Sequence, residues 1–459
     1  MQIIPKSNRR NIVIKIIFGI TSFSLSSMSL ASGFQLQEQS SLYLGTAYSG
    51  TAAWAADASS AFYNPAALTH IKNKQVVLSN ILINSNAAFT ASSTNIPFQP
   101  GISVPASQTD NANPGGLSLI PSIQYAARVN PNLVFGLSIA APFGLSTDYD
   151  PKGIMRYVAT YSELITLDVS PSFAYKATDW LSLGAGLDVL YAQAILDAQT
   201  TLATLGDIEK DGFQKNRASD WALGWHAGFL MDLCHNTRVG LNYRSKYNLN
   251  TKGVSQQLAP ITLFSPSQSG EFLIRPAHAD LVLPETLVLS AYHDLNRSWA
   301  IMADASWTAW SRLQTIGLRF EPLPNDVPNS IITATNTDTD LSFKDTFKLG
   351  FGVNYTYNNR WQFRAGTAYD QSPVKGTETR TARLPDSNRI WLALGASYTC
   401  AQLRVDLGYA HLFLKDAELS DNGPFRAGTD EPVLPFNNVS GKYFSYVDIL
   451  GIQLRYDFV

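Results

Sequence analysis

Alternation of apolar and polar residues with a period of two constrains this chain more than any other feature of its sequence. The clearest run covers residues 347–357, where Phe, Leu, Val and Tyr alternate with Lys, Gly, Asn and Thr. Residues 403–410 and 238–244 repeat the pattern. Because successive side chains of a β-strand point to opposite faces, these runs predict strands with one apolar and one polar face. A soluble β-sandwich would alternate in the same way, so the period alone leaves two all-β folds open.

The lengths of the connections between these runs distinguish the two folds. Long connections, polar or rich in proline, cover residues 91–116, 149–162, 196–220, 255–269, 321–341, 380–387 and 419–442. They alternate with tight turns at Asn130-Pro131-Asn132, Ala177-Thr178-Asp179, His235-Asn236-Thr237, Leu295-Asn296-Arg297, Asn358-Asn359 and Cys400-Ala401. A transmembrane barrel has this asymmetry because its periplasmic turns stay short while its surface loops grow.

The expected fold is therefore all-β, a transmembrane antiparallel β-barrel of about 14 strands. Such a sheet must close, since an open edge in hydrocarbon leaves backbone groups unpaired. With an even number of strands, both termini lie in the periplasm, and the protein belongs in the bacterial outer membrane.

The last strand and the aromatic residues support this fold. From Leu450 to Phe458 every second residue is apolar, which is the type of final strand that the barrel-assembly machinery handles. Val459 departs from that type, because outer-membrane barrels usually stop at the aromatic residue. Aromatic residues at other strand ends predict girdles at the lipid interface. They are Trp180, Trp299, Trp361, Tyr357 and Tyr409.

Residues 1–31 have the features of a secretory signal peptide. Four basic residues precede an apolar stretch at residues 16–25, and Ser29-Leu30-Ala31 offers small residues for cleavage. Ser and Thr interrupt the stretch, which is too short for a membrane helix. Removing four of the 34 Lys and Arg residues leaves 30 against 36 Asp and Glu, a net charge of −6. This charge argues against a nucleic-acid partner.

Residues 32–73 lack sustained alternation, are rich in Ala, Ser and Gly, and are too long for a tail. We expect them to form a hatch inside the lumen of a barrel made by residues 74–459. Here the chain resembles the FadL/TodX family of outer-membrane transporters for fatty acids and other hydrophobic compounds. The N-terminal motifs that carry the resemblance are Gly33-Phe34-Gln35-Leu36, the spacing of Gly45, Ala47, Tyr48 and Gly50, Asp57-Ala58, and Asn64-Pro65-Ala66. Those in the barrel include Phe143-Gly144-Leu145, Asn242-Tyr243-Arg244-Ser245, Leu283-Pro284-Glu285 and Leu384-Pro385-Asp386.

The resemblance implies a route for the ligand. Surface loops capture it, an apolar pocket beside the hatch receives it, and a gap in the barrel wall releases it sideways. Sideways exit is physically sensible, because a hydrophobic solute gains more from the lipid of the outer membrane than from a water-filled pore. Candidate capture residues on the loops are Leu202, Leu205, Ile208, Leu258, Ile261, Leu263 and Phe264. The same apolar residues could instead pack the loops against each other.

The resemblance also assigns the hatch and the gap. Phe34 and Leu36 are candidates for a hatch movement that opens the inner pocket, although they could merely wedge the hatch in place. The gap corresponds to a kink in the third strand at Phe143 and Gly144, facing the hatch loop of Asn64, Pro65 and Ala66. A glycine there permits a strand break or marks a bulge.

A fatty-acid carboxylate needs a basic partner. The candidates at the lumen or its mouth are Arg156, Arg244, Lys348 and Arg364, together with Arg404. Most are expected to pair with lumen acids such as Asp168, Asp188, Asp304 and Asp406. Two positions that are basic in fatty-acid-transporting members correspond to Ala198 and Thr339, and an acidic pair common in the hatch is altered at Ala56. Aromatic or alkane ligands therefore stay open.

Catalysis and metal binding have little support in the sequence. The six histidines are scattered, and none forms a local motif with Ser and an acid, although a triad assembled in space stays open. No two histidines have metal-ligand spacing, and Cys234 and Cys400 lie on turns nearly opposite each other in the ring, so we expect free thiols, no metal and no cofactor.

The sequence thus favours a transporter of hydrophobic small molecules, with long-chain fatty acids as the expected ligands, and not an enzyme. Its partners would be the hydrophobic ligand, outer-membrane lipid and the barrel-assembly machinery. An adhesin or a general porin are the alternatives from other classes. A porin has no reason for the hatch motifs, and uptake after deletion of the hatch would separate the three.

Overall fold

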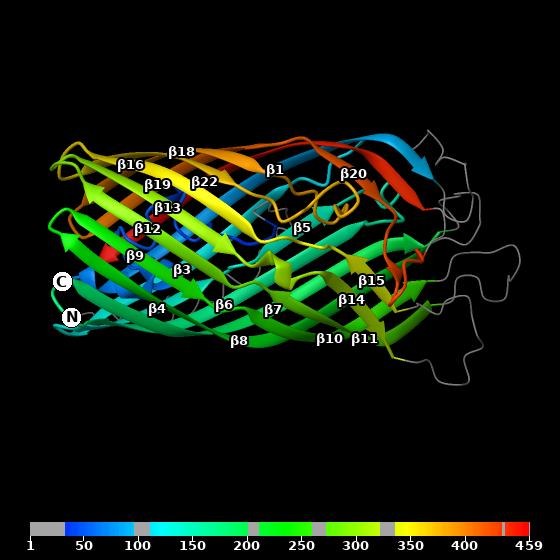
Figure 1. Ribbon diagram of the computed structural model, residues 1–459, viewed down its shortest axis with the longest axis horizontal. Coiled ribbons are helices and arrows are strands. Elements are labelled where there is room, and N and C mark those ends of the chain that lie inside the picture. Colours follow the sequence, from blue (N-terminus) through cyan, green and yellow to red (C-terminus); the bar gives the residue numbers. More distant parts are fainter. Residues whose placement is uncertain are drawn as a thin grey trace, which may run out of the picture.

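A computed structural model describes residues 33–95, 111–200, 211–258, 272–321, 336–433 and 437–458. The chain forms one closed antiparallel β-barrel whose 22 strand segments make 14 wall strands, as predicted (Figure 1). In the described ranges, no helix has the length and apolar character needed to cross a membrane.

The wall follows the order of the chain. Its first half comprises β1 (Gln75–Asn95), β2 (Asn111–Ala112), β3 (Leu117–Asn130), β4 (Leu133–Ala140), β5 (Gly144–Asp148), β6 (Tyr161–Lys176), β7 (Leu181–Thr200), β8 (Gly212–Cys234), β9 (Thr237–Arg244) and β10 (Tyr247–Leu258). Its second half comprises β11 (Phe272–Leu283), β12 (Thr286–Asp294), β13 (Trp299–Thr308), β14 (Thr315–Phe320), β15 (Thr337–Asp340), β16 (Thr346–Thr356), β17 (Trp361–Asp370), β18 (Arg389–Cys400), β19 (Leu403–Leu414), β20 (Ala417–Asp421), β21 (Phe425–Arg426) and β22 (Asn438–Asp457). The 3-10 turn η5 (Trp310–Arg312) interrupts the strand of β13 and β14.

The first and last strands close the ring. β1 and β22 pair in antiparallel register from Gln75 opposite Asp457 to Asn95 opposite Asn438. Beyond that ladder, the Phe458 N–H donates to the Lys74 carbonyl oxygen. Closure therefore removes the open edge, whose backbone groups would be unpaired in lipid.

The two faces of the wall divide as the alternation predicts. Phe347, Leu349 and Phe351 are about half exposed on the outer face, while Lys348 between them is buried. The final strand repeats this from Leu450 to Phe458, and all five aromatic residues expected in the girdles are exposed. This outer face is the apolar surface that lipid would cover.

All six tight turns lie at one end of the barrel, here called the short-turn end, and the opposite end is the long-loop end (Figure 1). Several of the expected long connections are shorter than predicted, because the strands continue, whereas the one expected over 380–387 is longer, since β17 ends at Asp370 and β18 begins at Arg389. β7 extends to Thr200 and β8 begins at Gly212, inside the loop expected over 196–220. Cys234 and Cys400 are exposed free thiols, as expected.

The N-terminal segment from Gly33 to Asn73 lies inside the barrel, toward the short-turn end (Figure 1). We call it the hatch. It contains the short helices α2 (Ser41–Leu44) and α3 (Ser60–Tyr63) and the 3-10 helix η2 (Pro65–His70). All residues of α2 and α3 are buried, so the lumen is filled with a packed core of hatch and wall side chains.

Candidate transport route

The wall is interrupted between β3 and the strand formed by β4 and β5. Residues 123–130 of β3 pair with β4, but Leu117–Ser122 pair only with β1. β5 pairs only with β6. In the described part of the chain, no backbone ladder joins these two stretches. The third strand breaks between Ala140, where β4 ends, and Gly144, where β5 begins, so this stretch is a gap in the pairing of the wall strands.

Gln39 of the hatch contacts both sides of the gap. Its side-chain amide donates to the Ala141 carbonyl oxygen at 2.8 Å, and its Oε1 accepts from the Ala141 N–H at 3.3 Å. On the other side its carbonyl oxygen accepts from the Ser122 hydroxyl at 2.8 Å. Gln39 is fully buried. It therefore supplies hydrogen bonds at a place where the two wall strands do not bond each other.

The residues just before Gln39 extend this cover as a short ladder. The Leu36 N–H donates to the Pro142 carbonyl oxygen at 2.8 Å, and the Gly144 N–H donates to the Phe34 carbonyl oxygen at 2.9 Å. Gln35 is the antiparallel partner of Phe143 between these two bonds. The hatch thus adds a strand of three residues to the broken wall, as an edge peptide does.

Aromatic rings form a partition at the side of the hatch that faces the long-loop end. The ring centroids of Phe34 and Trp310 are 4.7 Å apart, and those of Phe34 and Phe143 are 6.3 Å apart. Tyr247 packs against Phe143, and Phe343 packs against Trp310. Phe34 is 4% exposed, so its ring is held by wall residues far apart in the sequence.

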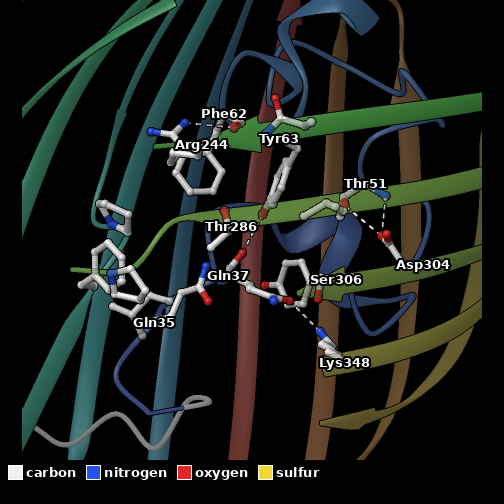
Figure 2. Close-up of a pocket in the computed structure, with 17 residues that line it drawn as sticks. Gln35, Gln37, Thr51, Phe62, Tyr63, Arg244, Thr286, Asp304, Ser306 and Lys348 are labelled. Carbon is white, nitrogen blue, oxygen red and sulfur yellow. Dashed lines mark hydrogen bonds between the residues drawn. The ribbon is translucent and has the colours of Figure 1, made fainter. Parts of the chain in front are cut away.

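A small cavity lies on each side of this partition. The outer cavity, toward the long-loop end, has about 90 Å³, and its surface is mostly apolar. Its lining includes Phe34, Leu145, Leu164, Leu281 and Ile316, and also the polar residues Ser162, Glu163, Asn216 and Thr251. The inner cavity has about 60 Å³ (Figure 2). Leu36, Phe143 and Val288 contribute apolar lining there, and Gln37, Asp304 and Lys348 contribute polar lining. Ligand pockets usually have about 300–1,000 Å³, so a ligand of that size could enter only if residues of the hatch or the wall moved.

Four of the five basic candidates are held by acids. Arg244 lies 2.9 Å from Asp168 and 3.0 Å from Asp188, and it also donates to the carbonyl oxygen of Phe62 in the hatch. Arg364 pairs with Asp406, as does Arg404, and Arg156 pairs with Asp211. The pairing of most basic residues with lumen acids is confirmed.

Lys348 differs from these arginines. Its ammonium donates to Gln37 Oε1 at 2.6 Å and lies over the rings of Trp391 and Tyr48 at 4.6 and 5.3 Å. No carboxylate oxygen of the described residues lies within 4.0 Å of it. Asp304 is the acidic residue that lines the inner cavity. Its carboxylate accepts hydrogen bonds from Thr51 and Ser290 (Figure 2).

Two predicted positions need correction. Asn64-Pro65-Ala66 does not face Phe143 and Gly144, because Asn64 donates to the Phe229 carbonyl oxygen in β8 and caps η2. The residues that face the kink are Phe34, Gln35 and Leu36 of the hatch. Leu258 is not on a loop, since it ends β10 and pairs with Phe213 and Phe272. The candidates Leu202, Leu205, Ile208, Ile261, Leu263 and Phe264 lie outside the described residues.

Sequence reasoning missed the glutamines that connect the hatch to the wall and the cavity. Gln35, Gln37 and Gln39 recur every second residue, next to the predicted Phe34 and Leu36. That alternation is the signal for a short strand and could have been recognised. Trp310 gave no such signal, because its role depends on a turn that brings it to the partition.

A closed barrel with an internal hatch, two cavities and a wall gap defines a class of protein, the outer-membrane transporters that move hydrophobic solutes. A model of the outer membrane protein transport protein family (OMPP1/FadL/TodX) matches residues 22–458, and the chain belongs to this family. The protein is therefore an outer-membrane transporter of hydrophobic compounds and not an enzyme.

Known proteins agree with this assignment. The long-chain fatty acid transport protein of Salmonella typhi is 28% identical over 423 residues, which cover 88% of this chain and 92% of that protein. Two crystal structures share the fold. A Pseudomonas aeruginosa FadL homologue has a TM-score of 0.79 and 22% identity over 93% of this chain and all of the other. The Pseudomonas putida toluene transporter TodX has a TM-score of 0.63 and 16% identity over 92% and 99%.

Proposed function

We propose that this protein takes up long-chain fatty acids. Surface loops capture the ligand, the hatch controls its entry into the inner cavity, and the wall gap releases it sideways into lipid. In this proposal the short-turn end and both termini are periplasmic, residues 1–31 are removed, residues 32–73 act as the hatch, and residues 74–459 form the barrel. Outer-membrane lipid receives the ligand, and the barrel-assembly machinery inserts the final strand. The capture step rests on loops that contain Leu202, Leu205, Ile208, Ile261, Leu263 and Phe264.

The observation that carries the proposal is the unpaired stretch of wall and its cover by the hatch. An open edge in hydrocarbon is costly, so a sequence that keeps one has a reason to do so. The cover includes five hydrogen bonds, each worth ~1 kcal/mol net. Their sum is of the size that ligand binding can shift between two states. Phe34 and Leu36 belong to this cover through their backbone bonds to Gly144 and Pro142, which supports their assignment to the gate.

An aromatic hydrocarbon is the second candidate ligand, and the surface of the outer cavity favours it. The outer cavity contains almost no polar surface, and Ala198 and Thr339 replace the basic residues expected for a fatty-acid carboxylate. The aromatic partition would also pack well against a planar ring. The Salmonella relative named for fatty acids and the Pseudomonas putida transporter named for toluene make both ligand classes worth testing.

A reversible disulfide tests the gate directly. Gln35 and Phe143 are opposite each other with hydrogen bonds on either side, so they form a non-hydrogen-bonded pair whose Cα atoms are roughly 4.5 Å apart in regular sheets. This spacing permits a disulfide. The variant Gln35→Cys/Phe143→Cys is made with Cys234→Ser and Cys400→Ser, and uptake of labelled oleate and toluene is measured in proteoliposomes.

We expect the oxidised protein to block both ligands and the reduced protein to admit at least one. The two single-cysteine variants control for loss of the Gln35 and Phe143 side chains, because neither can form the bond. Equal uptake in the oxidised and reduced states would overturn hatch-gated exit at this kink. Uptake of toluene without oleate would keep the gate and replace the ligand.

A further inference from the structure

A groove of about 680 Å³ at the short-turn end is lined by three cationic side chains and, among the residues that the structure describes, by no acidic one. Lys72 belongs to the end of the hatch, Lys74 immediately precedes β1, and Arg128 lies near the end of β3. Both lysines are exposed. The other lining residues are Asn73, Asn130, Pro131 and Phe458. Three positive charges from three parts of the chain therefore line one open space.

These three cations differ from other basic groups at the same end of the barrel. Lys176 lies 3.0 Å from Asp179, and Arg455 lies 2.9 Å from Asp457. For the cations of the groove, no carboxylate oxygen of the described residues lies within 4.0 Å of a side-chain nitrogen. The groove therefore keeps a positive charge that no neighbouring acid of the described chain compensates.

Arg128 is held in place by backbone oxygens. Its guanidinium donates to the carbonyl oxygens of Thr69, Ile71 and Pro131, each at 2.7 Å. These acceptors are neutral, so they orient the guanidinium and leave its charge available. Thr69 and Ile71 belong to the end of the hatch, and Pro131 belongs to the turn after β3. The groove thus lies where the hatch, β1 and β3 meet.

The groove borders the apolar outer face of the barrel, at the end where the C-terminus lies (Figure 1). The Phe458 N–H donates to the Lys74 carbonyl oxygen at 2.8 Å, so this lysine is level with the last aromatic ring of the final strand. The side chains of Phe458 and Tyr456 are each 42% exposed on the face that lipid would cover. Aromatic girdles mark the boundary between the hydrocarbon and the lipid head groups. The cations therefore lie at the depth of the head groups, where basic clusters attract anionic lipids.

We propose that this groove binds the phosphate group of an anionic phospholipid in the periplasmic leaflet of the outer membrane, with the acyl chains lying along Phe458 and Tyr456. The inference goes beyond the proposed function and rests only on its orientation, in which the short-turn end is periplasmic. The bound phosphate connects Lys72 of the hatch with Lys74 and Arg128 of the wall. It thereby strengthens the attachment of the hatch at the point where the chain enters β1.

The test titrates the full-length barrel, in a neutral detergent, with short-chain phosphatidylglycerol. Phosphatidylcholine of the same chain length and inorganic phosphate are the comparison probes. The unfolding temperature reports binding, and hydrogen exchange of residues 69–75 reports its place. We expect phosphatidylglycerol to raise the unfolding temperature and to slow exchange in this segment, and the other two probes to do neither. Binding should weaken as salt is added, because exposed charges are screened.

Two double variants separate the groove from the general charge of this end. Lys72→Gln/Lys74→Gln removes two charges at exposed positions, so the barrel should still assemble. Its affinity for phosphatidylglycerol should be at least about tenfold lower, since each basic residue near an anionic lipid contributes to binding. Arg297→Gln/Arg360→Gln removes the same number of charges from exposed positions at the same end, outside the groove. This control should bind as wild type does.

The outcomes separate the inference from the proposed function. Equal loss of affinity in both double variants would assign binding to the overall charge of this end and overturn the groove. Equal stabilisation by inorganic phosphate and by phosphatidylglycerol would reject a lipid as the ligand. Labelling of Cys234 or Cys400, exposed at the same end, in intact cells by a maleimide polymer too large for porins would overturn the periplasmic leaflet.

Oleate uptake by the same preparations tests the proposed function independently. Selective binding of phosphatidylglycerol without uptake of oleate would keep this inference and reject the proposed function. Uptake without selective binding would do the reverse.

Discussion

The hatch meets the wall in two different ways. Against β17, β18 and β19 the wall ladder is continuous, and glycines let the backbones come together. A Cβ on Gly366 would overlap the Thr46 backbone, and one on Gly408 would lie 2.5 Å from the Ser41 carbonyl oxygen. Against β3 and β5 the ladder is broken, and hydrogen bonds from hatch residues 34–39 replace it. Backbone packing makes the first contact rigid, whereas the second can be broken bond by bond.

The hatch should therefore move more easily on the gap side than on the glycine side. Close backbone packing has no second arrangement nearby, because any shift opens voids or creates overlaps. A few hydrogen bonds on an otherwise unpaired edge can be exchanged for bonds to water or ligand at small net cost. We therefore expect substitutions on the glycine side to damage the hatch and substitutions on the gap side to change how easily it opens.

The largest expected effect comes from Phe34→Ala at the partition. Loss of a ring that is 4% exposed should destabilise the closed hatch by about 3–5 kcal/mol and join the two cavities. Hydrogen exchange of the hatch and basal toluene permeation should both increase. Phe351→Ala on the lipid face is the control, since its ring is 48% exposed. Unchanged permeation in a folded Phe34→Ala barrel would contradict the partition.

Next in size is Gly366→Val, which tests the rigid contact. The new side chain overlaps the Thr46 backbone, so the hatch must shift, at a cost of about 1–3 kcal/mol or more. Thermal unfolding of the purified barrel and proteolysis of the hatch report this loss. Gly376→Val is the matched control, because a Cβ there has no atom within 4 Å. If both valines had the same effect, the glycine side would not be the fixed side.

The wall of the barrel could be predicted from the sequence, and the gate could be predicted only in part. Alternation and connection lengths give the closed ring because both depend on local repeats, such as residues 347–357. Phe143 and Gly144 were found through a family resemblance. The sequence did not show which hatch residues face Phe143 and Gly144. The contact of Leu36 with Pro142 joins segments about 100 residues apart, so no local pattern indicates it.

The orientation of the basic residues could be predicted from the sequence, but their acidic partners could not. The sequence predicts that Lys348 points inward, since it lies between Phe347 and Leu349, and that Arg244 does, since it continues the polar positions that alternate with Val239, Leu241 and Tyr243. It cannot show that Asp168 and Asp188 lie within 3.0 Å of Arg244, whereas no carboxylate oxygen of the described residues lies within 4.0 Å of the Lys348 ammonium. That distinction depends on the relative register of four strands, β6, β7, β8 and β9, and on where the hatch lies.

A smaller effect is expected for Gln39→Ala, which removes the side-chain bonds to Ala141 and leaves a buried N–H and C=O without them. The cost should be about 1–3 kcal/mol, seen as faster hydrogen exchange of Ala141 and faster uptake at low ligand concentration. Gln402→Ala, on an exposed turn, is the control. An Ala141 amide that stays equally protected would show that Gln39 does not hold the gap.

The smallest effect is a pH dependence of the same segment, through Glu38. Burial raises the pKa of this carboxyl from 4.5 to about 7, and the nearby Lys348 opposes the rise. The closed hatch thus holds the proton more tightly than the open one. The stabilisation is complete below pH 4.5 and is lost as the pH rises to about 7.

Between pH 6 and 7 the opening equilibrium should increase roughly fivefold, which is about 1 kcal/mol. Hydrogen exchange of hatch amides, corrected for the intrinsic rate, measures this change. Glu38→Gln keeps the shape of the side chain and cannot ionise, so the slope should disappear while hatch packing stays. A slope that survives in Glu38→Gln would assign the pH dependence to another group. A flat profile in wild type would mean that water reaches Glu38 in the closed hatch and that the gap side is already open at neutral pH.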